Sequence, residues 1–226
     1  MEFTYYGHSC FLINTGTHRL LFDPFITHNE LAKNIDTTKI EADYIFISHG
    51  HIDHIADAVK IALQTNALVI CNWEIYEWLG KKGLAKIHPM NTGGSKQFDF
   101  GTVKCVTAQH SSGLPDGSYG GNPMGFIIQT DHQNFYYSGD TALTLDMQLI
   151  PLWTKLSYCI LPIGNNFTMD VADAIKAANF VQCKKVIGVH YNTFGFIVID
   201  TAQAQQQFTE AGAELFLPSI GHTITI

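Results

Sequence analysis

Residues 46–57 read FISHGHIDHIAD, which places three histidines and two aspartates in twelve positions. The stretch overlaps an apolar run, Tyr44–Ile47, that is typical of a buried strand. Burying a polar group without a partner costs roughly 1–3 kcal/mol, and burying a charge costs more. A bound metal ion would supply the partners that these side chains need. The stretch therefore predicts a metal site at the end of a strand.

The spacing within this stretch separates the ligands into two groups. Residues two apart in an extended segment project to the same side, so His49 and His51 can face one metal ion. Asp53 and His54 lie where a helix begins and can face a second ion. Nitrogen and carboxylate ligands without a thiolate suit Zn, Mn or Fe. The alternative, a polar loop with a helix-capping aspartate, leaves three neighbouring histidines unexplained.

Three later segments repeat this pattern of an apolar strand followed by a histidine or an aspartate. VKCVTAQH ends in His110, NFYYSGD ends in Asp140, and KKVIGVH ends in His190. Each of them alone is more often a core or capping residue. Strand ends can converge at one edge of a sheet sandwich, so together with the first motif they predict one shared site.

The remaining chain predicts the fold class. Gly7, Gly16 and the pair Asp23-Pro24 separate short apolar runs, which indicates a meander of antiparallel strands. Further strands then alternate with helices, and no linker or low-complexity segment divides the chain. We therefore expect a single domain over residues 1–226, built as a four-layer αββα sandwich. The helices are predicted at residues 55–64, 73–79, 171–179 and 202–211.

Composition excludes several classes of protein. Hydrophobic residues make up 46% of the chain and charged residues 15%, which favours a sizeable core and argues against disorder. The net charge of −7 argues against nucleic acid as a partner. Five scattered cysteines without a CxxC pair predict reduced core thiols. The sequence shows neither a signal-like start nor an apolar run of about 20 residues. We expect a cytoplasmic protein that does not bind membranes.

These motifs resemble the metallo-β-lactamase superfamily over nearly the whole chain. HxHxDH at residues 49–54 is the specific part, the later histidines and aspartate follow in the expected order, and LLFDPF at residues 20–25 matches the superfamily's first motif. YYGHSCFLI, PIGNNFTM and GVHYNTF resemble a narrower branch of cytoplasmic metal-dependent hydrolases. That branch is similar to the ascorbate-6-phosphate lactonase and N-acylphosphatidylethanolamine phospholipase D groups.

The resemblance implies an αββα sandwich with two metal sites at one edge. It implies that Asp140 bridges both sites. It also implies the other ligands: His49, His51 and His110 at site one, and Asp53, His54 and His190 at site two.

Three further residues are weaker candidates for contacts behind the ligands or with the substrate. Asp23 supports a metal loop or belongs to a plain Asp-Pro turn. His8, which follows Gly7, is either close to the site or an exposed turn residue. Asn192 hydrogen-bonds the substrate or only shapes its loop.

Residue types and resemblance together predict an enzyme, a dinuclear metal-dependent hydrolase. A hydroxide bridging two divalent ions would attack a small ester, lactone or phosphodiester, with Asp53 as the catalytic residue that orients it. Zinc is favoured, with manganese or iron as alternatives. The expected partner is an anionic small molecule, held by the metals or by backbone donors of residues 111–121 beside His110. Two alternatives stay open: a non-catalytic metal-binding scaffold, and a phosphodiesterase or nuclease of the same superfamily.

Overall fold

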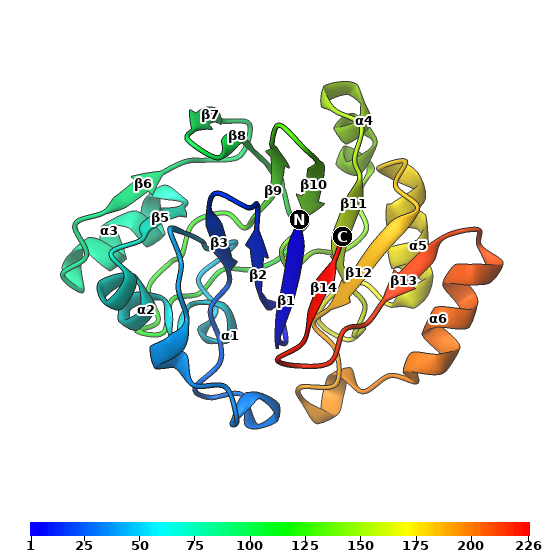
Figure 1. The fold of residues 1–226 in the computed structure, drawn as a ribbon, viewed down its shortest axis with the longest axis horizontal. Coiled ribbons are helices and arrows are strands. Elements are labelled where there is room, and N and C mark those ends of the chain that lie inside the picture. Colours follow the sequence, from blue (N-terminus) through cyan, green and yellow to red (C-terminus); the bar gives the residue numbers. More distant parts are fainter.

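A computed structural model describes residues 1–226 as two seven-stranded sheets packed against each other (Figure 1). The first sheet contains, in spatial order, β14 (Thr223–Thr225), β1 (Glu2–Gly7), β2 (Cys10–Asn14), β3 (Arg19–Phe22), β4 (Tyr44–Phe46), β5 (Leu68–Cys71) and β6 (Ile87–Pro89). The second contains β13 (Glu214–Phe216), β12 (Lys185–Val189), β11 (Tyr158–Pro162), β10 (Asn134–Tyr137), β9 (Met124–Gln129), β8 (Gly101–Thr107) and β7 (Ser95–Phe98).

Each sheet combines an antiparallel part with a parallel part. In the first sheet β1, β2 and β3 are antiparallel, as predicted, and β3 to β6 are parallel. In the second sheet β7 to β10 are antiparallel and β10 to β13 are parallel. Strands β1, β3 and β4 therefore run in one direction within their sheet, as do β8, β10 and β12 within theirs. This arrangement brings the ends of three strands together in each sheet.

Helices cover the outer faces of both sheets, which confirms the predicted αββα class. In Figure 1, α2 and α3 lie outside the first sheet and α5 and α6 outside the second. The helices are α1 (Ile52–Ile55), α2 (Ala58–Thr65), α3 (Trp73–Lys81), α4 (Ile150–Trp153), α5 (Val171–Phe180) and α6 (Thr201–Glu210). Short 3-10 turns are η1 (Glu30–Ala32), η2 (Thr37–Lys39), η3 (Leu145–Leu149) and η4 (Gly195–Ile197).

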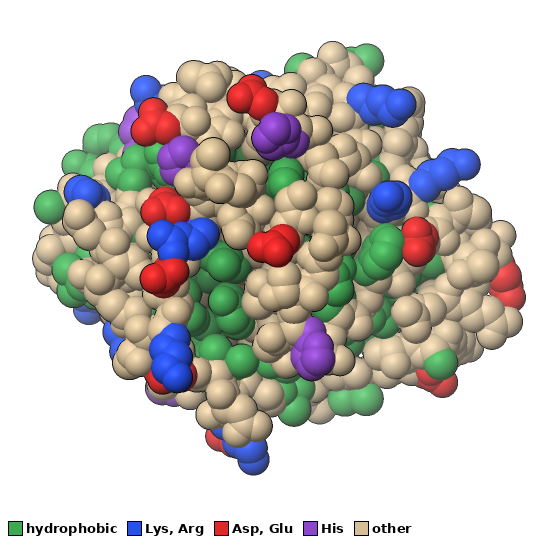
Figure 2. Space-filling view, viewed as in Figure 1, with side chains coloured by type: hydrophobic (Ala, Val, Ile, Leu, Met, Phe, Trp, Pro, Cys, Tyr) green, Lys and Arg blue, Asp and Glu red, His purple; other side chains and the backbone are tan.

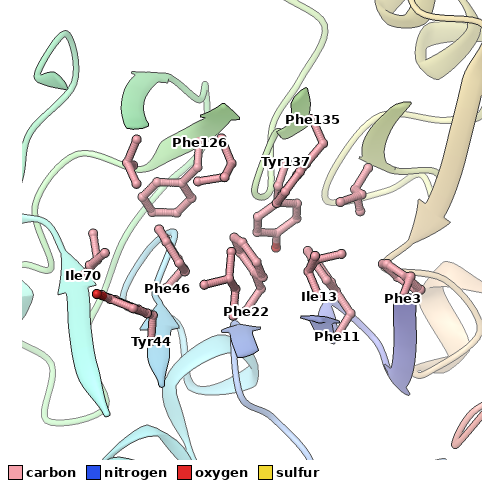
Figure 3. Close-up of a cluster of buried hydrophobic side chains, with 14 of the residues drawn as sticks. Phe3, Phe11, Ile13, Phe22, Tyr44, Phe46, Ile70, Phe126, Phe135 and Tyr137 are labelled. Atoms are coloured by element: carbon pink, nitrogen blue, oxygen red, sulfur yellow. The ribbon is translucent and has the colours of Figure 1, made fainter. Parts of the chain in front are cut away.

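An aromatic core joins the two sheets (Figure 3). The Phe11 and Phe22 rings stack with centroids 4.6 Å apart, and Phe22 stacks on Phe46 at the same spacing, so one ring from each of β2, β3 and β4 forms a continuous row. Phe126 and Tyr137 of the second sheet meet this row edge-on. Offset and edge-to-face pairs of this kind add stability beyond the burial of apolar area. The row holds the strands that carry the site in register.

The helix predicted over residues 55–64 is interrupted. Helix α1 ends at Ile55 and α2 begins at Ala58. Between them, the Asp57 carboxylate accepts hydrogen bonds from the amides of Ile26 and Thr27 and from the Thr27 hydroxyl. These contacts tie the start of α2 to the loop after β3, and helical spacing in the sequence carries no signal of them. The other three predicted helices are present, with ends within two residues of the prediction.

Three further features are the state of the cysteines, the distribution of surface charge and the length of the helices. All five cysteines are buried with free thiols. On the face shown in Figure 2, Lys and Arg side chains are scattered among acidic ones and form no continuous patch. No helix is both long and apolar enough to span a bilayer.

Candidate metal centre

The predicted ligands come from loops that follow strands at one edge of the sandwich. β4 leads into His49–His54, β8 into His110, β10 into Asp140 and β12 into His190. Because these strands share a direction within each sheet, their following loops meet. The fold thus brings together all seven side chains that the sequence singled out, across 142 positions between His49 and His190 counted inclusively.

One cluster contains the three histidines predicted for site one. Candidate ligand atoms of His49, His51 and His110 all lie within 4.8 Å of one another. His49 Nε2 and His51 Nδ1 are 2.9 Å apart. Zinc binds imidazole nitrogen at about 2.0–2.1 Å, so nitrogens at such mutual distances can share one ion. His49 is fully buried, whereas His51 and His110 are partly exposed, so the cluster opens toward solvent.

A second cluster contains the residues predicted for site two, with one addition. Ligand atoms of Asp53, His54 and His190 lie within 4.8 Å of one another, and His8 belongs to the same group. His54 and His190 are buried, and the Asp53 side chain is 21% exposed. The carboxylate of Asp53 is therefore the member of this cluster that solvent or a substrate can reach.

Asp140 lies between the two clusters. Its Oδ2 is 2.9 Å from His190 Nε2, 3.2 Å from His54 Nε2 and 3.7 Å from His110 Nε2. The side chain is 3% exposed. One oxygen therefore approaches histidines of both clusters, which is the position that a shared ligand requires.

Asp23 stands behind the clusters and orients His54. Its carboxylate accepts hydrogen bonds from the Ser48 amide at 2.7 Å, the Ser48 hydroxyl at 2.6 Å, the Tyr137 hydroxyl at 2.5 Å and His54 Nδ1 at 2.9 Å. With Nδ1 engaged, His54 can offer only Nε2 to an ion. Carboxylates in this role fix the orientation of a metal-binding imidazole and raise its basicity. Ser48 and Tyr137 are partners that the sequence did not single out.

His8 was expected close to the site or in an exposed turn, and it is 1% exposed and touches the second cluster. Its Nε2 is 3.0 Å from Asp53 Oδ2, and its Nδ1 is 3.0 Å from the Thr193 hydroxyl. The backbone of His8 adopts a positive φ of 56°, and its carbonyl accepts the His190 amide at 2.8 Å. The turn after β1 thus aims the ring at Asp53.

The buried polar atoms of the cluster fit a bound cation. Asp140 Oδ1 is buried and lacks a hydrogen-bond partner, and buried His54 Nε2 faces carboxylate oxygens of Asp140 at 3.2 Å and of Asp53 at 3.8 Å. Asp23, Asp53 and Asp140 bring three carboxyl groups into the same small volume. Buried carboxylates need opposite charge nearby, and a single imidazolium supplies too little of it. Nitrogen and carboxylate donors without thiolate fit divalent ions such as Zn, Mn or Fe.

Burial lowers the pKa values of the three histidines in the first cluster, which favours the neutral form that binds metal. It lowers the pKa of His49 well below the usual range and also lowers the pKa values of His51 and His110. These imidazoles are therefore neutral near pH 7 and have a lone pair to offer, because a ligand must be deprotonated to bind metal.

In the second cluster, the charges of neighbouring groups outweigh the effect of burial on the pKa values. Burial lowers the pKa of His54, but the Asp140 and Asp23 carboxylates outweigh it and hold that pKa well above the usual range. Burial raises the pKa of Asp140, and the nearby His190 and His54 outweigh it and lower that pKa. Without metal, these carboxylates favour the protonated form of His54, and a bound divalent ion would displace its proton.

We expect the metal-free protein to lose stability as pH falls from 6.5 toward 4, with His8 contributing. Burial lowers the pKa of His8 to about 4, whereas an unfolded histidine takes a proton near pH 6.5. In this window the unfolded chain binds more protons, so the free energy of unfolding falls with pH by at most about 1.4 kcal/mol per pH unit for one group. Urea unfolding of chelator-treated wild type and His8→Gln from pH 7.5 to 4.5 should give a shallower pH dependence for the variant. Equal slopes would contradict the assignment.

The remaining predicted contacts shape loops. Asn192 Oδ1 accepts the Ile199 amide at 2.8 Å, and the Asn192 amide donates to the Ile197 carbonyl at 2.8 Å. The loop after His110 is closed by its own backbone: the Leu114 amide donates to Ser118, and the Gly120 amide donates to Ser112. These amides are already engaged and are not free to hold an anion.

Comparisons with known proteins identify relatives of this chain in sequence and in fold. The family model described as "Beta-lactamase superfamily domain" matches residues 18–191. A UPF0173 metal-dependent hydrolase of Flavobacterium johnsoniae is 51% identical, with all of both chains covered. The UPF0173 metal-dependent hydrolase YtkL of Bacillus subtilis is 41% identical over all of this chain and 97% of its own. The structure of Igni18, a metallo hydrolase from Ignicoccus hospitalis, superposes with a TM-score of 0.90 at 33% identity and covers 100% of this chain and 97% of that one.

Proposed function

The chain belongs to the beta-lactamase superfamily and, within it, to the UPF0173 metal-dependent hydrolases. From this premise we propose that it binds two divalent ions and cleaves an ester, lactone or phosphodiester bond in a small molecule. His49, His51 and His110 would hold one ion, and Asp53, His54 and His190 the other. Asp140 would contact both.

The observation that carries this proposal is the position of Asp140 between two groups of ligand atoms. Its Oδ2 lies within 3.7 Å of histidine nitrogens from both groups, and its Oδ1 has no hydrogen-bond partner. A purely structural ion pair would not leave a buried carboxylate oxygen without a partner. The donor set suits zinc first, with manganese or iron as alternatives.

Divalent ions at such a centre supply Lewis acidity toward the scissile group and make water a nucleophile near neutral pH. The protein's own contribution is to set the charge and orientation of the ligands. Asp23 orients His54 through Nδ1. Ser112 donates to the Gly120 carbonyl and accepts the Gly50 amide, which fixes the segment between His49 and His51.

Asp53 is the residue we assign to water orientation. It is the most exposed carboxylate of the centre, and His8 holds its Oδ2 at 3.0 Å. Burial raises the pKa of Asp53, but His54 and His8 outweigh it, so that the pKa lies well below its usual range. Asp53 therefore stays ionised at neutral pH and can accept a hydrogen bond that orients an attacking water.

A substrate panel tests the proposed reaction. Protein loaded with Zn or Mn is assayed on lactones, carboxylic esters, thioesters, phosphodiesters, β-lactams and RNA, before and after chelation. We expect turnover of at least one small ester-like bond, its loss on chelation, and its return when metal is added back. His51→Gln should reduce it, whereas His132→Gln, an exposed histidine in the β9–β10 turn, should not.

Turnover confined to β-lactams or to RNA would refute the choice of bond. No turnover on any substrate, with both ions bound, would favour a metal-binding scaffold. Turnover that survives chelation with no metal detectable would remove the ions from the reaction altogether.

A further inference from the structure

Exposed apolar side chains occur in the loops that carry or adjoin metal-centre residues. Ile52, between His51 and Asp53, is 54% exposed. Phe167, in the loop after β11, is 50% exposed, and Phe196, in η4 after His190, is 76% exposed. Water-exposed aromatic rings grouped at the mouth of a site are typical of a surface that a ligand covers.

Three aromatic rings lie in the loops that follow β11 and β12, and one of them contacts His8 beside the centre. We define the aromatic wall as Phe167, Phe194 and Phe196. The Phe167 and Phe196 rings meet edge-on with centroids 6.0 Å apart, and the Phe194 ring lies 5.2 Å from the ring of His8. His8 in turn touches Asp53. The wall therefore begins one side chain away from the carboxylate that we assign to water orientation.

Backbone hydrogen bonds hold the two loops that carry the aromatic wall. Asn165 and Asn166 both have positive φ, at 64° and 57°, and the Asn165 carbonyl accepts the Phe167 amide. The Met169 amide donates to the Thr141 carbonyl, next to Asp140, at 3.1 Å. Asn192 closes the second loop from the other side. Both loops are thus tied to segments that carry metal-centre residues.

Basic side chains are missing from the same region. None of the 13 Lys and Arg residues lies in the segments that approach the centre, which are residues 7–9, 23–29, 47–57, 108–123, 138–145, 163–170 and 190–200. A hollow of about 350 Å³ next to His8, lined by residues such as Leu31, Tyr191 and Ile220, also has no Lys, Arg, Asp or Glu in its lining. Recognition of carboxylate or phosphate normally uses Arg, Lys or free backbone amides. In the loop after His110, the amides of Leu114, Gly117 and Gly120 already donate to carbonyls of the same loop.

We propose that the substrate carries an uncharged apolar group, an aromatic ring or an alkyl chain, that packs on the aromatic wall while the scissile bond lies at the metal centre. This inference rests on the proposed function and narrows its substrate class from anionic to apolar. Phe167 and Phe196 are then specificity-determining residues, because they are the most exposed members of the wall.

The kinetic test uses a homologous series of the bond class that the panel identifies. Its members end in a methyl group, a longer alkyl chain, a phenyl ring or a carboxylate of matched length. Wild type should gain roughly two- to fourfold in kcat/KM per added methylene, a gain expected for partial burial of each group. The double variant Phe167→Ser/Phe196→Ser should lose most of this gain, and the loss should appear as a higher KM. Leu152→Ser, at an equally exposed apolar site on α4 (77%), is the matched control and should behave as wild type.

A binding measurement separates this inference from the reaction. Calorimetry with metal-loaded protein and phenylbutanol, a neutral probe without a scissile bond, should show binding that weakens at least about fivefold in the double variant and not in Leu152→Ser. Binding of the probe together with no turnover on any substrate of the panel would keep the wall as an apolar subsite and count against the hydrolase.

The opposite pattern refutes the inference alone. Hydrolysis that prefers the carboxylate-ended member, or that is unchanged in the double variant, would leave the reaction standing and overturn the apolar subsite. Cosedimentation with neutral phosphatidylcholine vesicles that disappears in the double variant, with no chain-length preference in solution, would reassign the wall to a lipid surface and overturn it as well.

Discussion

Replacing Asp140 by alanine should reduce metal-dependent kcat/KM by more than about 100-fold and leave less than the full complement of metal bound. Asp140 Oδ2 lies within 3.7 Å of histidine nitrogens from both ligand clusters. Lewis-acid stabilisation by an ion contributes several kcal/mol, and each 1.36 kcal/mol lost is about a tenfold loss of rate. Elemental analysis after gel filtration measures the metal, and steady-state kinetics on the best panel substrate measure the activity.

Two further variants test whether the effect is specific to the carboxylate of Asp140. Asp140→Asn keeps the volume of the side chain and removes its charge, so it should fold and still lose metal. Asp146→Ala, on the same segment but exposed, should keep both metal and activity. Full metal content in Asp140→Ala, with activity near wild type, would remove Asp140 from the centre.

Replacing Asp23 by alanine should weaken metal binding by about 10–100-fold and lower the free energy of unfolding by roughly 3–5 kcal/mol. Asp23 accepts four hydrogen bonds in a fully buried position, and its removal leaves the donors of Ser48, Tyr137 and His54 without their partner. The His54 ring also loses the contact that sets its orientation. Titration with a metal in competition with a chelator gives the affinity, and urea unfolding gives the stability.

Asp57 provides the matched control for this second effect. It is also buried and accepts three hydrogen bonds, but these come from Ile26 and Thr27 and reach no proposed ligand. Asp57→Ala should therefore lose stability and keep its metal affinity. If the alanine variant of Asp23 does not fold, Asp23→Asn should show the affinity loss alone. Wild-type affinity in Asp23→Asn would contradict the orienting role.

The sequence predicted the sheet sandwich and a shared site because both depend on local pattern, whereas the full division of the residues between two sites came from the resemblance to the superfamily. Each candidate ligand follows an apolar strand, and parallel strand direction then brings the loops to one edge. The order of residues from His49 to His190 carries this information without knowledge of distant contacts. The helix interruption at Asp57 was not predicted, because helical spacing of apolar residues continues across it while the cause lies in the loop after β3.

The sequence pattern also did not predict contacts between residues that lie far apart in the chain. Tyr137 donates to Asp23 across 114 positions, and β14 pairs with β1 at opposite ends of the chain. His8 was left between two interpretations, because a histidine beside a glycine is equally compatible with a surface turn. Only the positive φ of that turn aims its ring at Asp53.

The expectation of an anionic substrate stays a prediction. It came from the likeness to a sugar-phosphate lactonase, whereas the segments that approach the centre carry exposed aromatic side chains and no Lys or Arg. The apolar substrate proposed above follows from which residues lie at the mouth, and motif spacing does not report on that.

The most direct test of the whole account is a metal titration of the chelator-treated protein, followed by activity and by elemental analysis at each step. We predict no hydrolysis without metal, two equivalents of divalent ion bound per chain at saturation, and activity that reaches its maximum only as the second equivalent binds. Full activity at zero equivalents, or saturation of both binding and activity at one, would contradict a centre built from two ions.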